Sequence, residues 1–375
     1  MERVGIVGVG HAGFAPMMAG VSYKELVFEA ALRAYEDAGV QPRSDVDSFV
    51  CCSEDLWEGT SIFDEYVPDQ LGAALRPVQT VAADGLFALA TGVMLIRSGI
   101  ASVVALEAHS KASNVLSLPE ITEFALDPVF ERPLRLHPGY VAGLEMRRFL
   151  EEGGCTEERC AEVVVKNRRN ALGNPVAAYP SAVDLDAVMA SPPAFSPLKA
   201  AECAERAEGA VVVVLAREDR ARGLSEAPVW VDGIGWATDA PMLSSRSWGV
   251  AAYARLGAER AYHQAGIRTP ASEIDFAEVD DTFAYKQLQH LEALGLATGG
   301  EAGSLPVNVS GGSLGMGSLF EANGLARVLE VVRQLRGEAG GRQLPGVRVG
   351  LAQSWRGVPT TTGAVAVLSV DEPAT

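Results

Sequence analysis

The chain has 375 residues, of which 48% are hydrophobic and 21% charged, and its formal net charge at pH 7 is −17. This length is sufficient for two packed α/β units, and the composition is ordinary for a globular protein. No run of basic residues interrupts the acidic balance, so nucleic-acid binding and anionic-membrane binding are disfavoured, whereas a basic protein partner is compatible. No segment reaches the roughly 18 uninterrupted apolar residues that suggest a membrane-spanning helix.

The amino terminus and the cysteines indicate a reduced, cytoplasmic protein. Residues 4–9 are apolar from the start of the chain and predict a buried strand, not a signal peptide. The five cysteines are odd in number and lack the paired spacing of a zinc site. We therefore expect buried structural thiols and no bound metal.

The first half of the chain alternates predicted strands and helices. Ser22 and Glu25 form a capping-box pattern before the amphipathic run 23–38, and Gly39 follows as the helix terminator. The other elements expected in this half are strands at 4–9, 48–53 and 102–108 and a helix at 85–98.

The segment from about residue 110 to residue 207 differs in composition from what precedes it. It is rich in prolines and polar turns, with helices expected near 140–152 and 157–168. We interpret it as a substructure inserted over the sheet. The apolar run 210–216 then predicts a buried strand that returns to the main sheet.

The second half repeats the pattern of the first. The helix and strand at 23–40 and 47–53 correspond to those at 253–267 and 275–281. In each case the helix ends in Ala-Gly-(Val/Ile), a short polar link follows, and the strand is led by Val-Asp or Ile-Asp. The duplication predicts two halves, 1–225 and 226–375, with mostly parallel sheets. The remaining expected elements are a strand at 229–235, a helix at 321–336 and strands at 348–353 and 363–370.

Four segments are expected to meet near the centre of such a duplicated fold. They are 78–85, 279–283, the glycine-rich stretch 308–318, and 350–357. Their order and spacing resemble the thiolase superfamily, in particular the branch of archaeal acetoacetyl-CoA thiolases and sterol-carrier-protein thiolases. Further similar stretches are Arg132-Pro133-Leu134, 165–171, 196–199 and Gly324-Leu325-Ala326. The resemblance implies two βαβαβαββ halves in a five-layered αβαβα thiolase fold.

The resemblance also implies what an active thiolase would need. A cysteine at a helix amino terminus attacks the acyl group, a histidine of a Gly-His-Pro segment activates it, and a histidine of a His-Asp-Ala-Phe segment holds the thioester oxygen. These three positions align here with Ala82, Ser318 and Asp280. A methyl group cannot form a thioester, so the ordinary thiolase mechanism is not expected.

The candidate catalytic residues are Asp280, Asp281 and Ser318. Two close carboxylates could raise one pKa and provide a general acid or base, but neighbours on an extended chain point to opposite sides, so one could instead cap a loop. Ser318 could donate to an acyl oxygen or satisfy the backbone. Glu321, where the family usually has glycine, is interpreted as a helix-dipole partner.

The candidate ligand-binding residues surround these positions. Asp84 could face the pocket or serve only the dipole of its helix. Ser310, Gly311 and Gly312 could bring backbone amides close to a ligand. The aromatic Phe283 and the cation Arg356, next to Trp355, complete the predicted site; Arg356 could grip an anionic ligand or form a structural pair.

Three functions are compatible with this sequence. The first is a non-condensing, acyl-CoA-binding subunit. The second is a carbon–carbon lyase of the retro-aldolase type that acts on a CoA thioester, an activity that in thiolase-like proteins often needs a small zinc-binding, OB-fold (DUF35-type) partner. The third is an acyltransferase that borrows its catalytic centre from another thiolase-like chain. All three imply a CoA thioester as ligand, no other cofactor, and a homodimer or heteromer.

Overall fold

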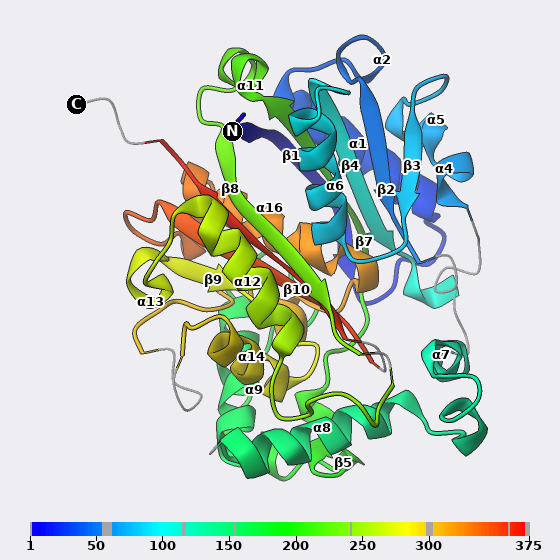
Figure 1. Ribbon diagram of the computed structural model, residues 1–375, viewed down its shortest axis with the longest axis vertical. Helices are drawn as coiled ribbons and strands as arrows, with labels where there is room; N and C mark the ends of the chain where they lie inside the picture. Colours follow the sequence, from blue (N-terminus) through cyan, green and yellow to red (C-terminus); the bar gives the residue numbers. More distant parts are fainter. Residues whose placement is uncertain are drawn as a thin grey trace.

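The computed structural model describes residues 2–54, 62–114, 118–153, 155–240, 242–297, 303–358 and 361–371. Within them a nine-stranded sheet has the order β3-β2-β4-β7-β1-β8-β11-β10-β9 (Figure 1). Its strands are β1 (Val4–Ala15), β2 (Ser48–Cys52), β3 (Val78–Val81), β4 (Val103–Ser110), β7 (Glu208–Arg217), β8 (Val229–Thr238), β9 (Phe276–Glu278), β10 (Val349–Arg356) and β11 (Thr362–Ser369).

The sheet consists of two parts with the same strand pattern. In the first part β7 pairs antiparallel with β1 and β4, and β2 pairs parallel with β4 and β3. In the second part β11 pairs antiparallel with β8 and β10, β9 pairs parallel with β10, and Val307 bridges Ala277 of β9 in parallel. A short antiparallel contact between β1 and β8 joins the parts. The strand pattern therefore has the internal symmetry expected from the repeated sequence.

The expectation of mostly parallel sheets is wrong, because β7 and β11 each run antiparallel to both of their neighbouring strands. β11 follows β10 after residues 357–361 only, a connection too short for the crossover that parallel neighbours need. β7 returns to the sheet from the insertion in the direction opposite to β4. Parallel pairing is thus confined to the outer strands.

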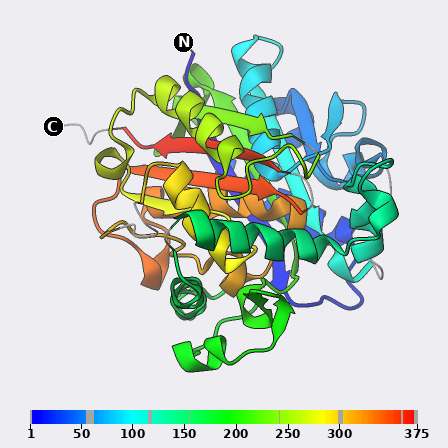
Figure 2. The same ribbon diagram turned by 60° about the horizontal axis from the view of Figure 1, so that its bottom comes forward.

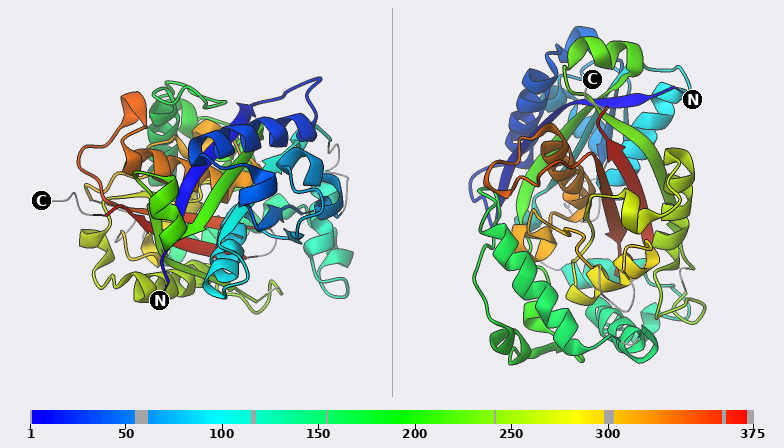
Figure 3. Two further views of the ribbon diagram at one scale, coloured as in Figure 1. Left: turned by 90° about the horizontal axis from the view of Figure 1, so that it is seen from above. Right: turned by 90° about the vertical axis from the view of Figure 1, so that its left-hand side faces the viewer.

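Helices and sheet parts alternate in five layers. Helix α1 (Tyr23–Ala38) covers the outer face of β1 and β7, and α12 (Ala252–Ala265) covers β8 and β11 (Figure 3). Helices α6 (Gly85–Arg97) and α16 (Asn323–Arg336) contact each other between the two sheet parts, inside a shared apolar core. This arrangement confirms the expected α/β class. The predicted capping box of α1 is also present, since the Ser22 hydroxyl accepts from the N–H of Glu25.

The insertion lies at one end of the sheet, at the bottom of Figure 1, and comes forward in Figure 2. It contains α7 (Leu118–Thr122), α8 (Pro138–Gly153), α9 (Glu157–Ala171), α10 (Leu185–Met189) and the hairpin β5 (Pro193–Phe195) and β6 (Leu198–Lys199). Its core is shared with α14 (Ala284–Ala293), a helix that the sequence patterns did not predict. Through α14 the insertion is packed directly onto the second half of the chain.

The remaining helices are short, with the bounds α2 (Pro42–Asp45), α4 (Phe63–Tyr66), α5 (Pro68–Leu71), α11 (Glu218–Leu224), α13 (Pro270–Glu273) and α15 (Gly312–Met316). The helix expected at 321–336 begins at Asn323, after a 3-10 turn at Phe320–Ala322. No helix in the described part of the chain is long and apolar enough to span a membrane.

Candidate functional site

A cavity of about 290 Å³ opens where the strand ends of both sheet parts meet the insertion. All four segments singled out in the sequence contribute to it, together with residues of the insertion. Its lining includes Glu54, Ala83, Asp84, His137, Phe195, Cys203, Arg206, Thr282, Phe283, Ser318, Glu321, Asn323, Trp355, Arg356 and Gly357. Most of this surface is apolar and aromatic, with carboxylates, two arginines and small polar side chains set into it.

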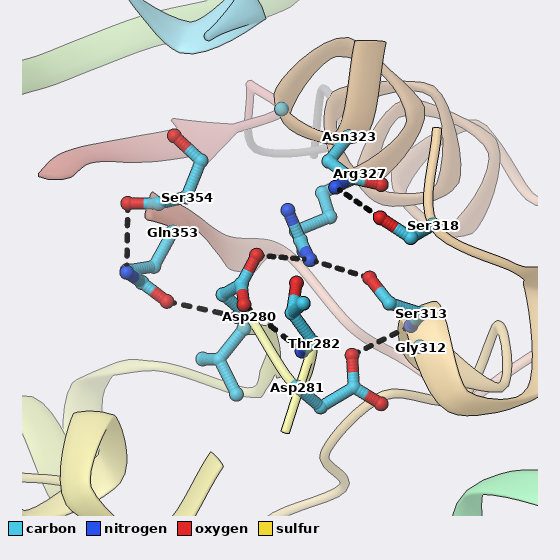
Figure 4. A network of polar contacts seen from close by, with 12 residues as sticks. Asp280, Asp281, Thr282, Gly312, Ser313, Ser318, Asn323, Arg327, Gln353 and Ser354 are labelled. Carbon is cyan, nitrogen blue, oxygen red and sulfur yellow. Dashed lines mark hydrogen bonds and ion pairs between the residues drawn. The ribbon is translucent and has the colours of Figure 1, made fainter. Parts of the chain in front are cut away.

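Asp280 follows β9 but does not line the cavity. Its fully buried carboxylate accepts hydrogen bonds from the guanidinium of Arg327 at 2.7 Å and from the backbone N–H of Thr282 at 3.0 Å (Figure 4). The same guanidinium nitrogen donates to the hydroxyl of Ser313 at 2.9 Å. The aspartate is therefore held in a buried ion pair and is not part of the cavity lining.

Asp281 points to different partners, as adjacent residues on an extended chain must. Its carboxylate accepts from the backbone N–H of Ser313 at 2.6 Å and from the side-chain amide of Asn167 at 2.7 Å. Burial raises the pKa of Asp281 to about 6, while Arg327 opposes the shift. Asp281 thus caps α15 and ties it to α9. The structure does not join the two aspartates into a carboxylate pair that faces the cavity.

Ser318 lies on the cavity wall, where the resemblance placed a histidine. Its hydroxyl oxygen accepts a hydrogen bond from the side-chain amide of Asn323 at 3.3 Å, and its backbone N–H donates to the carbonyl of Glu205 at 2.7 Å. Because the hydroxyl oxygen is an acceptor in this contact, its own proton can be donated to a ligand. Ser318 and Asn323 therefore form a neutral polar pair on the cavity wall.

Asp84 lies at the edge of the cavity, where its carboxylate has a structural role. One oxygen caps α6 by accepting from the N–H of Leu86 at 2.9 Å, and the other accepts from the N–H of Gly324 at 2.9 Å. Burial raises the pKa of Asp84 to about 6, although the backbone hydrogen bonds from Leu86 and Gly324 oppose the shift. The aspartate links the amino termini of the two central helices.

The glycine-rich turn predicted to approach a ligand is not part of the cavity lining. The hydroxyl of Ser310 donates to Glu278 at 2.5 Å. Gly311 and Gly312 have φ values of 107° and 57°, and a Cβ at either position would collide with Ala171 or with Asp281. The turn is therefore built for close packing of α15 against its neighbours.

Glu321 lines the cavity, a location that was not predicted from the sequence. It lies in the 3-10 turn before α16, and one carboxylate oxygen accepts the backbone N–H of Glu54 at 3.0 Å. The side chain of Glu54 in turn pairs with Arg356, which also donates to the carbonyl of Ala82 at 3.3 Å. The available signal was an acid at a position where the resemblance implied glycine. Ala82 itself is exposed and lies in the turn before α6.

Cys203 and His137 also reach the cavity from the insertion, and neither was predicted there. Burial raises the pKa of the Cys203 thiol to about 12, and the charges of Glu202 and Glu205 act in the same direction. The thiol is therefore protonated at neutral pH and weakly nucleophilic. The Nδ1 atom of His137 accepts from the N–H of Gly139 at 3.0 Å, and its ring stacks on Phe195.

Trp355 and Phe283 form an aromatic wall, with ring centroids 6.2 Å apart in an edge-on arrangement. Behind this wall the ammonium of Lys286 lies 4.2 Å from the indole centroid and pairs with Glu145 at 2.6 Å. Burial lowers the pKa of Lys286, an effect that Glu145 opposes. Lys286 belongs to the unpredicted helix α14, so its contact with the wall could not be anticipated.

Comparisons with known proteins agree with this architecture. Residues 235–370 match the family model described as thiolase C-terminal domain-like. An acetyl-CoA acetyltransferase of Methanothermobacter thermautotrophicus is 31% identical, over 98% of this chain and 99% of that protein. A 17-hydroxy-3-oxo-4-pregnene-20-carboxyl-CoA lyase of Mycobacterium tuberculosis is 29% identical, over 96% of this chain and 98% of that protein. The solved Ltp2-ChsH2(DUF35) aldolase superposes with a TM-score of 0.84 at 25% identity, over 99% and 98% of the two chains.

Proposed function

The chain belongs to the thiolase superfamily, and we propose that it binds a coenzyme A thioester in the cavity without forming an acyl-enzyme. The observation that carries this proposal is the chemistry of the lining. Its thiol, Cys203, has a raised pKa, and the residue aligned with the family nucleophile, Ala82, ends in a methyl group. The described lining supplies hydroxyl, amide and carboxylate groups that can bind an acyl thioester, and none of them is an activated thiolate.

Thiolysis and intact mass together test this proposal. Purified protein is incubated with acetoacetyl-CoA, with and without free CoA, while binding is followed by calorimetry. We expect saturable binding, no acyl adduct and no thiolysis. An acylated protein species, or rapid thiolysis by the chain alone, would contradict the proposal, and absence of binding would remove its premise.

A partner subunit is part of the same proposal. The similarity to an aldolase solved together with a DUF35 protein supports a heteromer with a small zinc-binding, OB-fold protein of that type, and a second thiolase-like chain is the alternative partner. The five free cysteines fit a reducing, cytoplasmic setting. Light scattering and co-purification from the source cells test the assembly; a chain that always isolates as a monomer would contradict it.

Retro-aldol cleavage is the second candidate, favoured by the Glu321 carboxylate on the cavity wall and by the similarity to a carbon–carbon lyase. In this reaction a base takes the proton of a 3-hydroxyl group, the Cα–Cβ bond breaks, and its electron pair passes to the thioester as an enolate that is then protonated. No covalent nucleophile is needed. Glu321 is the lining carboxylate that we assign as the base.

The variant Glu321→Gln tests this second candidate, because an amide oxygen can still accept the N–H of Glu54 but cannot take a proton. We expect cleavage of a 3-hydroxyacyl-CoA to fall at least about 100-fold, with binding retained. Glu259→Gln, at an exposed site of α12, is the matched control. An unchanged cleavage rate in Glu321→Gln, with or without the partner subunit, would reject the assignment.

A further inference from the structure

A second cavity, of about 630 Å³, lies between α9, α14 and the segment 303–309. Among the residues that the structure describes, it shares no lining residue with the first cavity. Three leucines, Leu288, Leu291 and Leu305, contribute to its apolar wall, and polar side chains of α9 and α14 line the rest. The proposed function makes no use of this space, so a ligand bound here would be additional to the thioester.

Lys166 of α9 reaches this second cavity as a cation without an ion pair. Within the described ranges its ammonium makes one hydrogen bond, to the carbonyl of Val307 at 3.1 Å, and contacts no carboxylate. The other lysines that are not exposed, Lys111, Lys199 and Lys286, each pair with a glutamate. Because an ammonium group carries three donors, two N–H groups of Lys166 remain available to a ligand.

The charge of Lys166 is not neutralised by contact with a neighbouring acid. Burial lowers the pKa of Lys166 to about 8, while the charges of Asp281 and Glu278 oppose the shift, so the ammonium form predominates at neutral pH. Asp281 accepts the backbone N–H of Ser313, and Glu278 accepts the hydroxyl of Ser310. Both acids are therefore held by other partners and act on Lys166 only from a distance.

Gln287 of α14 presents a second donor to the same cavity. Its Oε1 accepts from the side-chain amides of Asn167 at 2.8 Å and Asn308 at 2.9 Å. The Asn167 amide also donates to Asp281, and the Asn308 side-chain oxygen accepts the N–H of Val279, so both amides are fixed in orientation. The Nε2 of Gln287 therefore points away from them; it has no acceptor in the described part of the chain and is not enclosed by protein. Because Gln287 is 2% exposed and lines the cavity, this amide is an unpaired donor at the cavity wall.

We propose that this second cavity binds an aliphatic monocarboxylate. One carboxylate oxygen accepts from the Lys166 ammonium and the other from the Gln287 amide, while the aliphatic chain lies against the leucines. The remaining charged side chains of the described lining, Arg159 and Glu162, pair with each other at 2.9 Å, so Lys166 sets the net charge of the cavity. A single negative charge and an apolar chain match this lining, whereas a phosphate dianion would require further cationic donors.

Sodium hexanoate and hexanol, which differ in the carboxylate, test this proposal. Titrations of the full chain followed by methyl NMR give the affinity and the location of the ligand together. In the wild type we expect saturable hexanoate binding, NOEs from its chain to the methyl groups of Leu288 and Leu291, and at least about tenfold weaker binding of hexanol, which lacks the charged acceptor. Lys166→Met should weaken hexanoate binding at least about tenfold and leave hexanol binding within about twofold. Lys24→Met, at an exposed site of α1 outside the cavity, is the matched control.

Gln287→Glu is the second variant, because its carboxylate can still accept from Asn167 and Asn308 but repels a bound carboxylate. We expect hexanoate binding to be lost. Unchanged hexanoate affinity in either variant, equal affinities of the wild type for hexanoate and hexanol, or absence of the NOEs to Leu288 and Leu291 would overturn this inference, as would tighter binding of inorganic phosphate than of hexanoate. The titrations contain no CoA thioester, so their failure leaves the proposed function standing, and failure of acetoacetyl-CoA to bind leaves this inference standing.

Discussion

One carboxylate oxygen of Asp84 accepts the backbone N–H of Gly324 at 2.9 Å, and this contact joins the first turns of α6 and α16. The two helices come from different halves of the chain and lie in the central layer of the fold. The aspartate therefore stabilises the interface between the halves at the edge of the cavity. Both oxygens of this carboxylate, which was predicted to lie near the site, accept hydrogen bonds from the backbone of the two helices.

Substitution of Gly324 tests this contact. A Cβ at position 324 would lie 2.0 Å from Oδ1 of Asp84, so Gly324→Ala must displace the aspartate or the helix. We expect a loss of about 2–3 kcal/mol in the free energy of unfolding, measured by urea denaturation. Gly223→Ala in α11, where nothing lies within 4 Å, is the control and should be neutral or slightly stabilising. Equal stability of the two variants would contradict the packing described.

The buried Glu278 predicts a fall in stability with rising pH. Burial, together with the charge of Glu330, raises the pKa of Glu278 from 4.5 to about 8. Between these values the folded protein keeps a proton that the unfolded chain releases. The free energy of unfolding therefore decreases as pH rises through this window and levels off above it.

Glu278→Gln mimics the protonated side chain, so its free energy of unfolding should lack the decrease that Glu278 causes as pH rises. Urea titrations at about pH 5 and pH 9 measure the free energy of unfolding. Between these two pH values the free energy of unfolding of the variant should increase relative to that of wild type by on the order of 2–3 kcal/mol. Parallel pH profiles of the two proteins would show that Glu278 does not carry the effect.

Removal of the Lys286 ammonium should destabilise the protein strongly. Lys286→Met leaves the carboxylate of Glu145 buried without its cation, which typically costs about 3–5 kcal/mol. The double variant Lys286→Met with Glu145→Gln should recover part of this loss, as a double-mutant cycle measures. Arg255→Met, which breaks an ion pair whose side chains are both 56% exposed, should cost less than about 1 kcal/mol. Similar losses in the buried and exposed pairs would argue against the role of Lys286.

Cys203 should resist alkylation although it borders the cavity. Its pKa of about 12 leaves almost no thiolate near neutral pH, so iodoacetamide should modify it at least about tenfold more slowly than in the urea-unfolded chain. Peptide mass spectrometry after timed quenching measures the rate. Rapid modification in the folded protein would reveal an activated thiol and would remove the support for a non-covalent site.

Local features of the chain could be predicted where neighbouring residues determine them. The capping box of Ser22 and Glu25 and the left-handed Gly39 bound α1 as expected, because capping uses groups only a few residues apart. The repeat of helix and strand also predicted the symmetric strand pattern, because each repeated unit has its own hydrophobic periodicity. The strands were wrongly predicted to be mostly parallel, because the direction of a strand depends on the path of the long connections between strands.

The cavity could be predicted only in part. The four segments were identified from the chain, and Ser318, Phe283 and Arg356 do line the cavity. The catalytic assignments of Asp280 and Asp281 stay predictions, and the structure places both beneath the surface. Arg327 is 47 residues from Asp280, and no local pattern indicates their ion pair.

The amino-acid sequence was sufficient to establish the alternation of strands and helices, the internal duplication and the absence of a sulfur atom at residue 82, because these are properties of composition and short-range order. The tertiary structure decided which carboxylates are buried in ion pairs and caps, and which, like Glu321, reach the cavity. It also placed Lys286 behind Trp355. These relationships depend on distances between residues far apart in the chain, and the free energy of burial and pairing that sets their chemistry exists only after the chain has folded.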